Sequence, residues 1–388
     1  MPPVAATVTA YDVVTAYGTG VDACWDGLAS AGSAITDVER FSTDAFISHC
    51  AATVPGLAPR SGESLVMQML APLLSAAAEI VPADTTVLLA TTTGEIDLLE
   101  RNILDGAGGT HDSRPGLLLD RVCSALGTTG PAMMISAACA SSTSAIAHAA
   151  ALVRGGETTS VLVVACDSVT EFVFSGFSTL MALDAEGARP FDEARKGLTP
   201  GEAAGYMLVM ADPRAAAEDR QTLGEVAGWG MSNDANHMTG PSRDGGGLAA
   251  AINGALTSAG TEKGAVASIC AHGTGTPYND AMEMKAFRLV FGENPVPTHS
   301  VKGGIGHTMG AAGLVEAAIT LESLRRGVVP PTVNTAAVDG DAVGWVSTEA
   351  VPTQGASAAL TTNSGFGGVN AALMLKRRCS VIGGRRSG

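Results

Sequence analysis

The sequence predicts an α/β protein made of two similar halves, because strands and helices alternate along most of the chain. Short runs rich in valine and leucine, such as Thr86–Ala90 and Ser160–Ala165, are typical of strands that are buried on both faces. The order of the elements repeats at an offset of roughly 170–180 residues. We therefore expect halves at 1–215 and 216–380, a flexible tail at 381–388, and a mainly parallel sheet covered by helices on both faces.

The first half begins with a strand-like run from residue 4, followed by a turn and a helix that carries Trp25 and Leu28. Residues 36–60 show no clear period, and we expect a loop there. Apolar residues at helical spacing predict a helix within 62–81. The remaining predictions for this half are strands at Thr86–Ala90, Ser160–Ala165 and Tyr206–Met210 and a helix at Leu117–Leu126.

The second half repeats this order. A strand at Val266–Ala271 runs into a glycine-rich turn, as the strand at Thr86–Ala90 does. A helix over 311–326 ends in Arg-Arg-Gly, and a closing strand at Ala371–Leu375 follows a glycine cluster. The joint between the halves is expected near residues 212–225.

The composition excludes several classes of protein. A chain of 388 residues that is 46% hydrophobic can bury a large core. A net charge of −15 argues against general nucleic-acid binding. No apolar run approaches the ~20 residues that span a bilayer, and the N-terminus does not read as a signal peptide. Seven scattered cysteines without a CxxC pair indicate neither a disulfide framework nor a metal site, and they predict a cytoplasmic location.

Cys139 is the first candidate catalytic residue. It follows the apolar run Met133–Ile135 and precedes an alanine-rich helical segment. At the start of a helix the partial positive charge favours the thiolate, so we expect a lowered pKa and a better nucleophile. Taken alone, Cys139 is explained equally well as a buried structural cysteine.

Two histidine motifs favour the catalytic interpretation. His272 stands in Ala-His-Gly-Thr-Gly-Thr-Pro, and His307 stands in Lys-Gly-Gly-Ile-Gly-His. A cysteine followed by two histidines, each in a glycine-rich turn, is the pattern expected of a thiol nucleophile with imidazole partners. The other histidines lie in no such pattern.

With these motifs the chain resembles the elongating β-ketoacyl-acyl-carrier-protein synthases of the thiolase-like superfamily, from Thr15 to about Met374. The resemblance implies the five-layered αβαβα thiolase fold with two pseudo-symmetric halves. It also implies decarboxylative Claisen condensation of a Cys139-bound acyl group with a malonyl-acyl carrier protein. No metal or separate cofactor is expected, since phosphopantetheine on the carrier protein holds the substrates.

The resemblance also implies roles for individual residues. Cys139 would hold the acyl group, and His272 and His307 would bind the malonyl thioester carbonyl as the enolate forms. The backbone N–H groups of Cys139 and Phe366 would form the oxyanion hole, and Gly365 and Gly367 would free the backbone there. The family has an additional phenylalanine just before this motif, and Ser364 takes its place here.

Further positions follow from the same resemblance. Lys302 would pair with Glu283 and orient His307. The resemblance gives four more substrate-binding residues at the entrance. The hydroxyls of Thr274 and Thr276 would hold the pantetheine arm, and His237 and Thr239 belong to a loop beside the substrate entrance. An acidic carrier protein would be repelled by a chain of charge −15, so Arg195 and Lys196 are expected to form a local docking patch.

Three alternatives were weighed. A non-catalytic chain-length-factor-like subunit of a ketosynthase heterodimer would lack Cys139, and a degradative thiolase would carry a second late catalytic cysteine. A starter-type synthase would have asparagine in place of His307. Family members form dimers, either with a second copy or with a silent homologue, and Ser160–Ala165 is expected to pair across the dimer axis. The segment from Asp167 to Leu180 resembles type II synthases that build polyenes.

Overall fold

The computed structural model describes residues 4–104, 106 and 113–378, so the predicted tail at 381–388 lies outside the described residues. The described strands are β1 (Ala6–Thr15), β2 (Gly18–Thr19), β3 (Thr36–Asp37), β4 (Cys50–Ala51), β5 (Thr86–Ala90), β6 (Ala132–Ile135), β7 (Ser160–Asp167), β8 (Ala203–Ala211), β9 (Gly224–Asn233), β10 (Ile269–Cys270), β11 (Thr298–His299), β12 (Val328–Val329), β13 (Val351–Pro352), β14 (Ala358–Gly365) and β15 (Val369–Lys376).

The described α-helices are α1 (Val21–Ala29), α2 (Leu65–Ala78), α3 (Ile96–Leu104), α4 (Pro115–Leu126), α5 (Ser141–Gly155), α6 (Glu171–Thr179), α7 (Asp212–Ala217), α8 (Gly246–Ala259), α9 (Pro277–Phe291), α10 (Lys302–Ile305) and α11 (Ala312–Arg326). Short 3₁₀ helices lie at η2 (Lys263–Ala265), η3 (Met309–Ala311) and η4 (Phe366–Gly368).

Two equivalent five-stranded layers form the main sheet. The strand orders β6-β5-β7-β8-β1 and β11-β10-β14-β15-β9 match strand for strand. Only two residue pairs join the layers, Thr7 with Glu225 and Val8 with Gly224, where β1 meets β9. The predicted pseudo-symmetric halves are thus confirmed as a structural repeat. The boundary predicted at 215/216 falls within α7 and stays a prediction.

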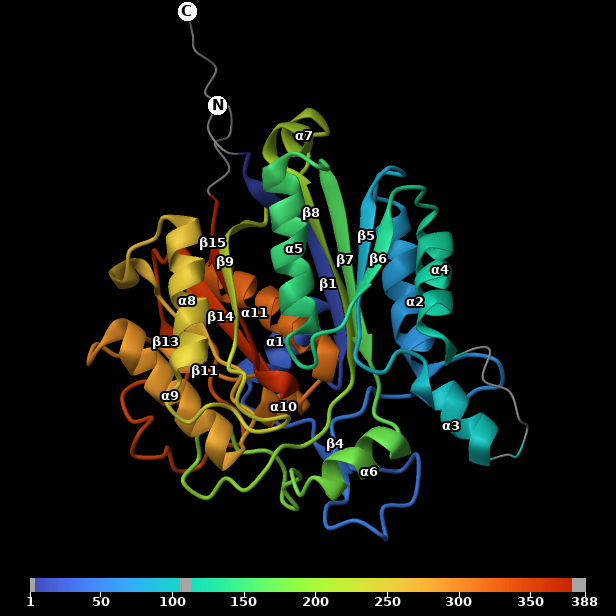
Figure 1. Ribbon diagram of the computed structural model, residues 1–388, viewed down its shortest axis with the longest axis vertical. Helices are drawn as coiled ribbons and strands as arrows, with labels where there is room; N and C mark the ends of the chain where they lie inside the picture. Colours follow the sequence, from blue (N-terminus) through green and yellow to red (C-terminus); the bar gives the residue numbers. More distant parts are fainter. Residues whose placement is uncertain (1–3, 105, 107–112, 379–388) are drawn as a thin grey trace, which may run out of the picture.

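Five layers follow from where the helices pack. Helices α5 and α11 contact each other and strands of both sheet layers. Helices α2 and α4 cover one outer side and α8 and α9 cover the other, as Figure 1 shows. The chain therefore has the αβαβα arrangement expected of the thiolase fold.

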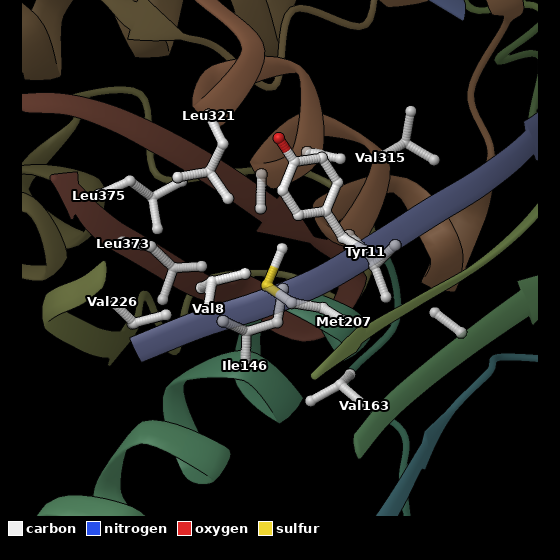
Figure 2. Packing of buried hydrophobic residues seen from close by; sticks show 14 of the residues in the cluster. Val8, Tyr11, Ile146, Val163, Met207, Val226, Val315, Leu321, Leu373 and Leu375 are labelled. Atoms are coloured by element: carbon white, nitrogen blue, oxygen red, sulfur yellow. The ribbon is translucent and has the colours of Figure 1, made fainter. Parts of the chain in front are cut away.

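The central layer has an apolar core because α5 and α11 bury almost every side chain. Figure 2 shows Ile146 of α5 and Val315 of α11 close to Val8, Met207 and Leu373 from both sheet layers. Small residues allow the two helices to approach closely. A Cβ added to Gly313 of α11 would lie 1.8 Å from Thr143 Oγ1 of α5.

The prediction of a mainly parallel sheet is wrong. β5 runs parallel to β6 and β7, and β10 runs parallel to β11 and β14, but the other pairs in each layer are antiparallel. The reversal is clearest at η4, where a short turn joins β14 to β15 without a crossover helix.

Several local predictions also differ from the structure. The loop predicted at 36–60 contains the short pair β3–β4. Part of the segment from Asp167 to Leu180, for which no helix was predicted, forms helix α6. Strand β1 carries a register shift between Val8 and Ala10, which agrees with the irregular sequence there. Among the described residues, no helix is long and apolar enough to cross a membrane.

The strand expected at the dimer axis was wrongly chosen. Strand β7 pairs with β5 on one side and β8 on the other, so neither of its edges is free. Its apolar sequence reflects burial inside the sheet. The edge of this layer is β6, whose only described neighbour is β5 and whose Met133 is 43% exposed.

Candidate active site

Cys139 lies in a tight turn between β6 and the first turn of α5. Ala138 adopts a left-handed φ of 49°, which costs an alanine strain of roughly 1–3 kcal/mol. Ser141 holds the turn, because its hydroxyl accepts from Ala137 N at 2.8 Å and donates to Ala138 O at 2.6 Å. Cys139 is 8% exposed. The turn therefore fixes a largely buried thiol at the helix start, as the sequence predicted.

The predicted acidity of the thiol is wrong. Burial raises the pKa of the Cys139 thiol to about 11, against the opposing charge of Lys302 and the backbone N–H of Phe366. Loss of water around the thiolate is the largest of these effects. At neutral pH the resting cysteine is protonated.

His307 reaches Cys139 from the turn between α10 and η3. Its Nε2 lies 2.9 Å from Cys139 Sγ. Its backbone N donates to Thr199 O at 2.7 Å, and the preceding Gly306 packs so closely on Pro200 O that a Cβ would lie 2.7 Å away. This close packing explains the glycine before the histidine.

His272 occupies the turn after β10, and Glu283 of α9 fixes its backbone. The carboxylate of Glu283 accepts from the N–H of His272 at 2.7 Å and from that of Gly273 at 2.6 Å. The rings of His272 and His307 lie 5.2 Å apart, nearly perpendicular at 87°. Two loops from separate strands thus bring the imidazoles together beside Cys139.

The hydrogen-bond partners assign the same tautomer to both histidines. Nδ1 of His272 faces two donors, Lys302 Nζ at 3.2 Å and Asn363 Nδ2 at 3.1 Å, so it must accept. Nδ1 of His307 accepts from Met309 N at 3.3 Å. Each ring therefore carries its proton on Nε2.

Both rings are also neutral. Burial, followed by the charge of Lys302, holds the pKa of His272 and of His307 well below the usual range. A neutral imidazole with a proton on Nε2 is a hydrogen-bond donor, and one such donor already faces Cys139 Sγ. The pair is suited to bind a carbonyl oxygen on which negative charge develops.

Lys302 pairs with Glu316 of α11, and the predicted pairing with Glu283 is wrong. Lys302 Nζ also contacts Nδ1 and the carbonyl oxygen of His272, so it orients this histidine and not His307 as expected. All of these groups are buried, and the charges compensate each other. Glu283 acts on the backbone of the same turn, without contacting the His272 ring.

Asn363 is a member of this network that sequence reasoning missed. Its Nδ2 donates to Glu316 Oε2 at 2.7 Å as well as to His272, and its Oδ1 accepts from Thr143 Oγ1 of α5. It is fully buried at the end of β14. Its place directly before the glycine motif was the available signal, and only tertiary contacts reveal its partners.

The predicted oxyanion-hole residues lie together. The Phe366 N–H points to the Cys139 sulfur. A Cβ on Gly365 would lie 3.1 Å from Cys139 N and 3.0 Å from Ala137 O, so a larger residue would crowd the backbone of the nucleophile turn. Gly367 adopts a left-handed φ of 82°. The Phe366 ring packs on Phe177 of α6 at 6.2 Å between centroids, and Phe177 lies 6.4 Å from His307.

A cavity of about 690 Å³ leads to these groups from the surface. Cys139, His272, His307 and Phe366 lie along it, as do the four predicted entrance residues Thr274, Thr276, His237 and Thr239. One wall is apolar, formed by Phe177, Leu180, Met181 and Leu198. The arrangement leaves room for an acyl chain beside the thiol.

The four entrance residues form local hydrogen bonds that the sequence did not specify. Thr274 and Thr276 hydrogen-bond each other through their hydroxyls at 2.9 Å. Nδ1 of His237 accepts from the backbone of Thr239 and Gly240, so this histidine shapes its own loop.

Arg195 does not present a free charge for docking. Its side chain is 9% exposed and pairs with Asp339 at 2.7 Å, and Asp280 lies 3.8 Å away. That part of the prediction is wrong, because a buried and paired guanidinium cannot attract a partner. Lys196 is exposed and lies along the cavity.

Sγ of Cys139 and a ring nitrogen of each histidine lie within 4.8 Å of one another. A group of this size could also hold a metal ion. The prediction that it holds none stays a prediction.

Comparisons with known proteins agree with this geometry. Residues 79–215 match the model for the beta-ketoacyl synthase N-terminal domain, and residues 223–336 match that for the C-terminal domain. A 3-oxoacyl-[acyl-carrier-protein] synthase 2 from Vibrio cholerae is 30% identical over 406 residues, which cover 95% of this chain and 98% of that protein. The enzyme of the same name from Staphylococcus aureus (strain COL) is 32% identical over 275 residues, covering 68% and 66%.

Solved structures are also similar. The ishigamide ketosynthase/chain length factor has a TM-score of 0.88 and 29% identity, covering 97% of this chain and all of that one. A ketosynthase in complex with its chain length factor from Xenorhabdus doucetiae has a TM-score of 0.83 and 25% identity, covering 97% and 98%.

Proposed function

The chain belongs to the beta-ketoacyl synthase family, and from that premise we propose how its own residues carry out the condensation. The family assignment makes it a 3-oxoacyl-acyl-carrier-protein synthase, an acyltransferase of chain elongation in fatty acid or polyketide synthesis. The observation that carries the proposal is the 2.9 Å contact between His307 Nε2 and Cys139 Sγ, with His272 in the same tautomer beside it.

In the first step Cys139 attacks an acyl thioester and releases the carrier thiol. The sulfur gives up its proton as it attacks, and the leaving thiolate takes up a proton, so the exchange is balanced. Negative charge on the carbonyl oxygen is stabilised by the N–H groups of Cys139 and Phe366. The product is an acyl group bound to Cys139 as a new thioester.

In the second step a malonyl thioester loses carbon dioxide. The electron pair of the broken bond forms an enolate, whose oxygen accepts from Nε2 of His272 and His307. The enolate carbon then attacks the acyl carbonyl on Cys139. The C–S bond breaks, and the 3-oxoacyl chain leaves on the carrier protein.

The experiment that tests this function separates the two steps. Wild-type protein incubated with an acyl thioester should gain one acyl mass, and Cys139→Ala should gain none. Cys24→Ala is a matched control, because Cys24 is buried in α1 outside the cavity. An adduct that persists in Cys139→Ala would refute the assignment of the nucleophile.

A subunit that only sets chain length would not require this chemistry. The presence of Cys139 with both histidines supports the catalytic role over the chain-length-factor-like alternative. We propose that the chain pairs with a second subunit of the same fold through the free edge of β6. Two similar structures are of a ketosynthase together with a chain length factor, which supports this pairing.

Sedimentation of the purified chain, alone and after co-expression with a candidate partner, distinguishes a homodimer from a heterodimer. An active monomer would contradict the pairing. We further propose an acidic acyl carrier protein as substrate carrier and a cytoplasmic location, which the unpaired described cysteines support. The polyene class of product stays a prediction, and product masses obtained with malonyl carrier protein would test it.

A further inference from the structure

The two exposed cations of the cavity are the starting point. Arg243 and Lys196 are the only lysine and arginine among the described lining residues, and both are exposed. Within residues 4–104, 106 and 113–378, neither side chain forms an ion pair.

Arg243 is held in a defined orientation. Its guanidinium lies 4.6 Å from the ring centroid of Tyr278, a cation–π arrangement. Stacking occupies one face of the guanidinium and leaves the N–H groups at its edge available. No protein acceptor for these N–H groups is present in the part of the chain that the structure describes. A planar fork of free donors suits the oxygens of a phosphate.

One wall of the cavity connects this end to the catalytic centre. Along the chain from His272 through Thr274 and Thr276 to Tyr278, the side chains change from buried to half-buried to exposed. A phosphopantetheine arm has the same order of groups, with its thioester at one end, amides along it and a phosphate at the other. The thioester belongs beside His272, which places the phosphate near Arg243.

Among the described lining residues, one acidic side chain, Asp234, accompanies these cations. Asp234 accepts from Asn370 Nδ2 at 2.7 Å and from Ser242 N at 2.8 Å. Its charge is therefore directed at the loop that carries Arg243. With two cations and one carboxylate, the described lining keeps a net positive charge for a ligand.

We propose that Arg243 and Lys196 bind the phosphate of the phosphopantetheine arm, with Tyr278 positioning the arginine. This site rests on the proposed function, since the arm must deliver a thioester to Cys139. It assigns Lys196 to the arm of the carrier and not to the carrier's protein surface.

The test compares three hexanoyl thioesters, of pantetheine, of 4′-phosphopantetheine and of coenzyme A, with the carrier-bound thioester as a fourth substrate. Acylation of Cys139 is followed by intact mass. The full-length wild type, with its partner subunit if one is required, should prefer phosphopantetheine over pantetheine by about three- to tenfold in KM, as expected for two exposed charge contacts. In Arg243→Gln with Lys196→Gln, this ratio should fall to near one.

A control variant with the same change of charge and the result with coenzyme A complete the test. Arg60→Gln with Lys263→Gln removes the same charge elsewhere on the surface and should keep the wild-type ratio. Thermal melting identifies a variant that is misfolded, and the two single variants then replace the double one. A preference that also extends equally to coenzyme A would assign the site to the shared phosphate in either source.

Two results would overturn the proposal. If the double variant keeps the phosphate preference but loses only carrier-bound activity, the cations contact the carrier protein. If the wild type shows no phosphate preference while acylating Cys139 normally, the phosphate site is absent although the proposed function stands. Absence of any acylation in the wild type would refute the proposed function itself.

Discussion

The turns after β5 and after β10 occupy equivalent places in the two halves, yet they do different work. In each turn, the residue two positions after the last paired residue of the strand lies opposite a polar side chain of the neighbouring strand. The pairing Ala90–Ala165 leads to Thr92 and Asp167, and the pairing Cys270–Thr361 leads to His272 and Asn363.

Asp167 is saturated by donors. Its carboxylate accepts from the hydroxyls of Thr91, Thr92 and Thr93, from the backbone N–H of Thr92 and Thr93, and from Gly310 N just before α11. Every oxygen lone pair is used to hold loops of the two halves together. No polar atom remains for a substrate.

Asn363 also spans the halves, through Thr143 of α5, but one of its N–H donors is directed at His272 Nδ1. Together with Lys302 Nζ, this donor fixes the proton of His272 on Nε2, where a substrate oxygen can accept from it. The same position in the two halves thus either holds loops together, as Asp167 does, or orients a catalytic side chain, as Asn363 does. The difference is which hydrogen-bonding atoms remain available.

The largest expected effect comes from the C-terminal half. His272→Ala should still accept an acyl group on Cys139, because His272 does not contact the sulfur in the resting site. Release of carbon dioxide from a malonyl thioester should slow by ~10²–10³, the usual cost of one lost oxyanion donor. Radiolabelled carbon dioxide release measures this step. Thr92→Ala at the equivalent position should leave the decarboxylation rate within a few-fold, and equal losses in both variants would refute the comparison.

Asp167→Asn tests whether the Asp167 carboxylate holds the loops of the two halves together. An amide in place of the carboxylate puts an N–H group against N–H and O–H donors, which should lower the free energy of unfolding by about 2–4 kcal/mol. Urea denaturation followed by circular dichroism measures the change. An unchanged midpoint would mean that the loops are held by other contacts.

Asn363→Ala should reduce decarboxylation by roughly tenfold, since it removes one of the two donors that fix the His272 tautomer. Acylation of Cys139 should change less, so the ratio of the two rates is the informative quantity. Asn363→Asp is the second variant to measure. Its carboxylate would accept a hydrogen bond from a protonated Nδ1 of His272 and so favour the opposite tautomer. The proposal for Asn363 fails if both variants keep the wild-type ratio.

The smallest effect is a pH profile. With the pKa of Cys139 raised to about 11 by burial, its alkylation by iodoacetamide should keep rising with pH beyond 8.5, where an ordinary free thiol levels off. The same shift means that stability contributed by the protonated thiol is present below pH 9 and is lost as the pH rises towards 11. Intact mass after timed alkylation gives the rate. A plateau near pH 7 would show that the helix N-terminus dominates after all.

Much of this arrangement was predictable from the sequence because it depends on local chemistry. Cys139, His272 and His307 sit in turns whose glycines and small residues are dictated by close backbone approach, and such residue types are visible in a sequence. The strand at Thr86–Ala90 was predicted with its observed bounds because burial on both faces leaves an uninterrupted apolar run.

The remainder depends on tertiary contacts. The partner of Lys302 is Glu316 and not Glu283, since both carboxylates are buried near it and only the packing of α11 decides between them. The pKa of Cys139 depends on how completely water is excluded. Strand β7 was mistaken for an edge because an interior strand and an apolar edge strand have the same sequence pattern.

The free edge of strand β6 also affects the chain before the edge is covered by another subunit. The strand has one described neighbour, ends a few residues before the nucleophile, and exposes Met133. A newly made copy that finds no partner therefore presents an open ladder of backbone groups to every other chain in the cell. Covering this edge, by a second copy or by a homologous subunit, would then also protect the chain from aggregation. Recombinant production of the chain alone and together with a candidate partner should show which of the two covers the edge. A soluble homodimer would mean a second copy, and a yield of folded material that rises with the partner would mean a homologous subunit.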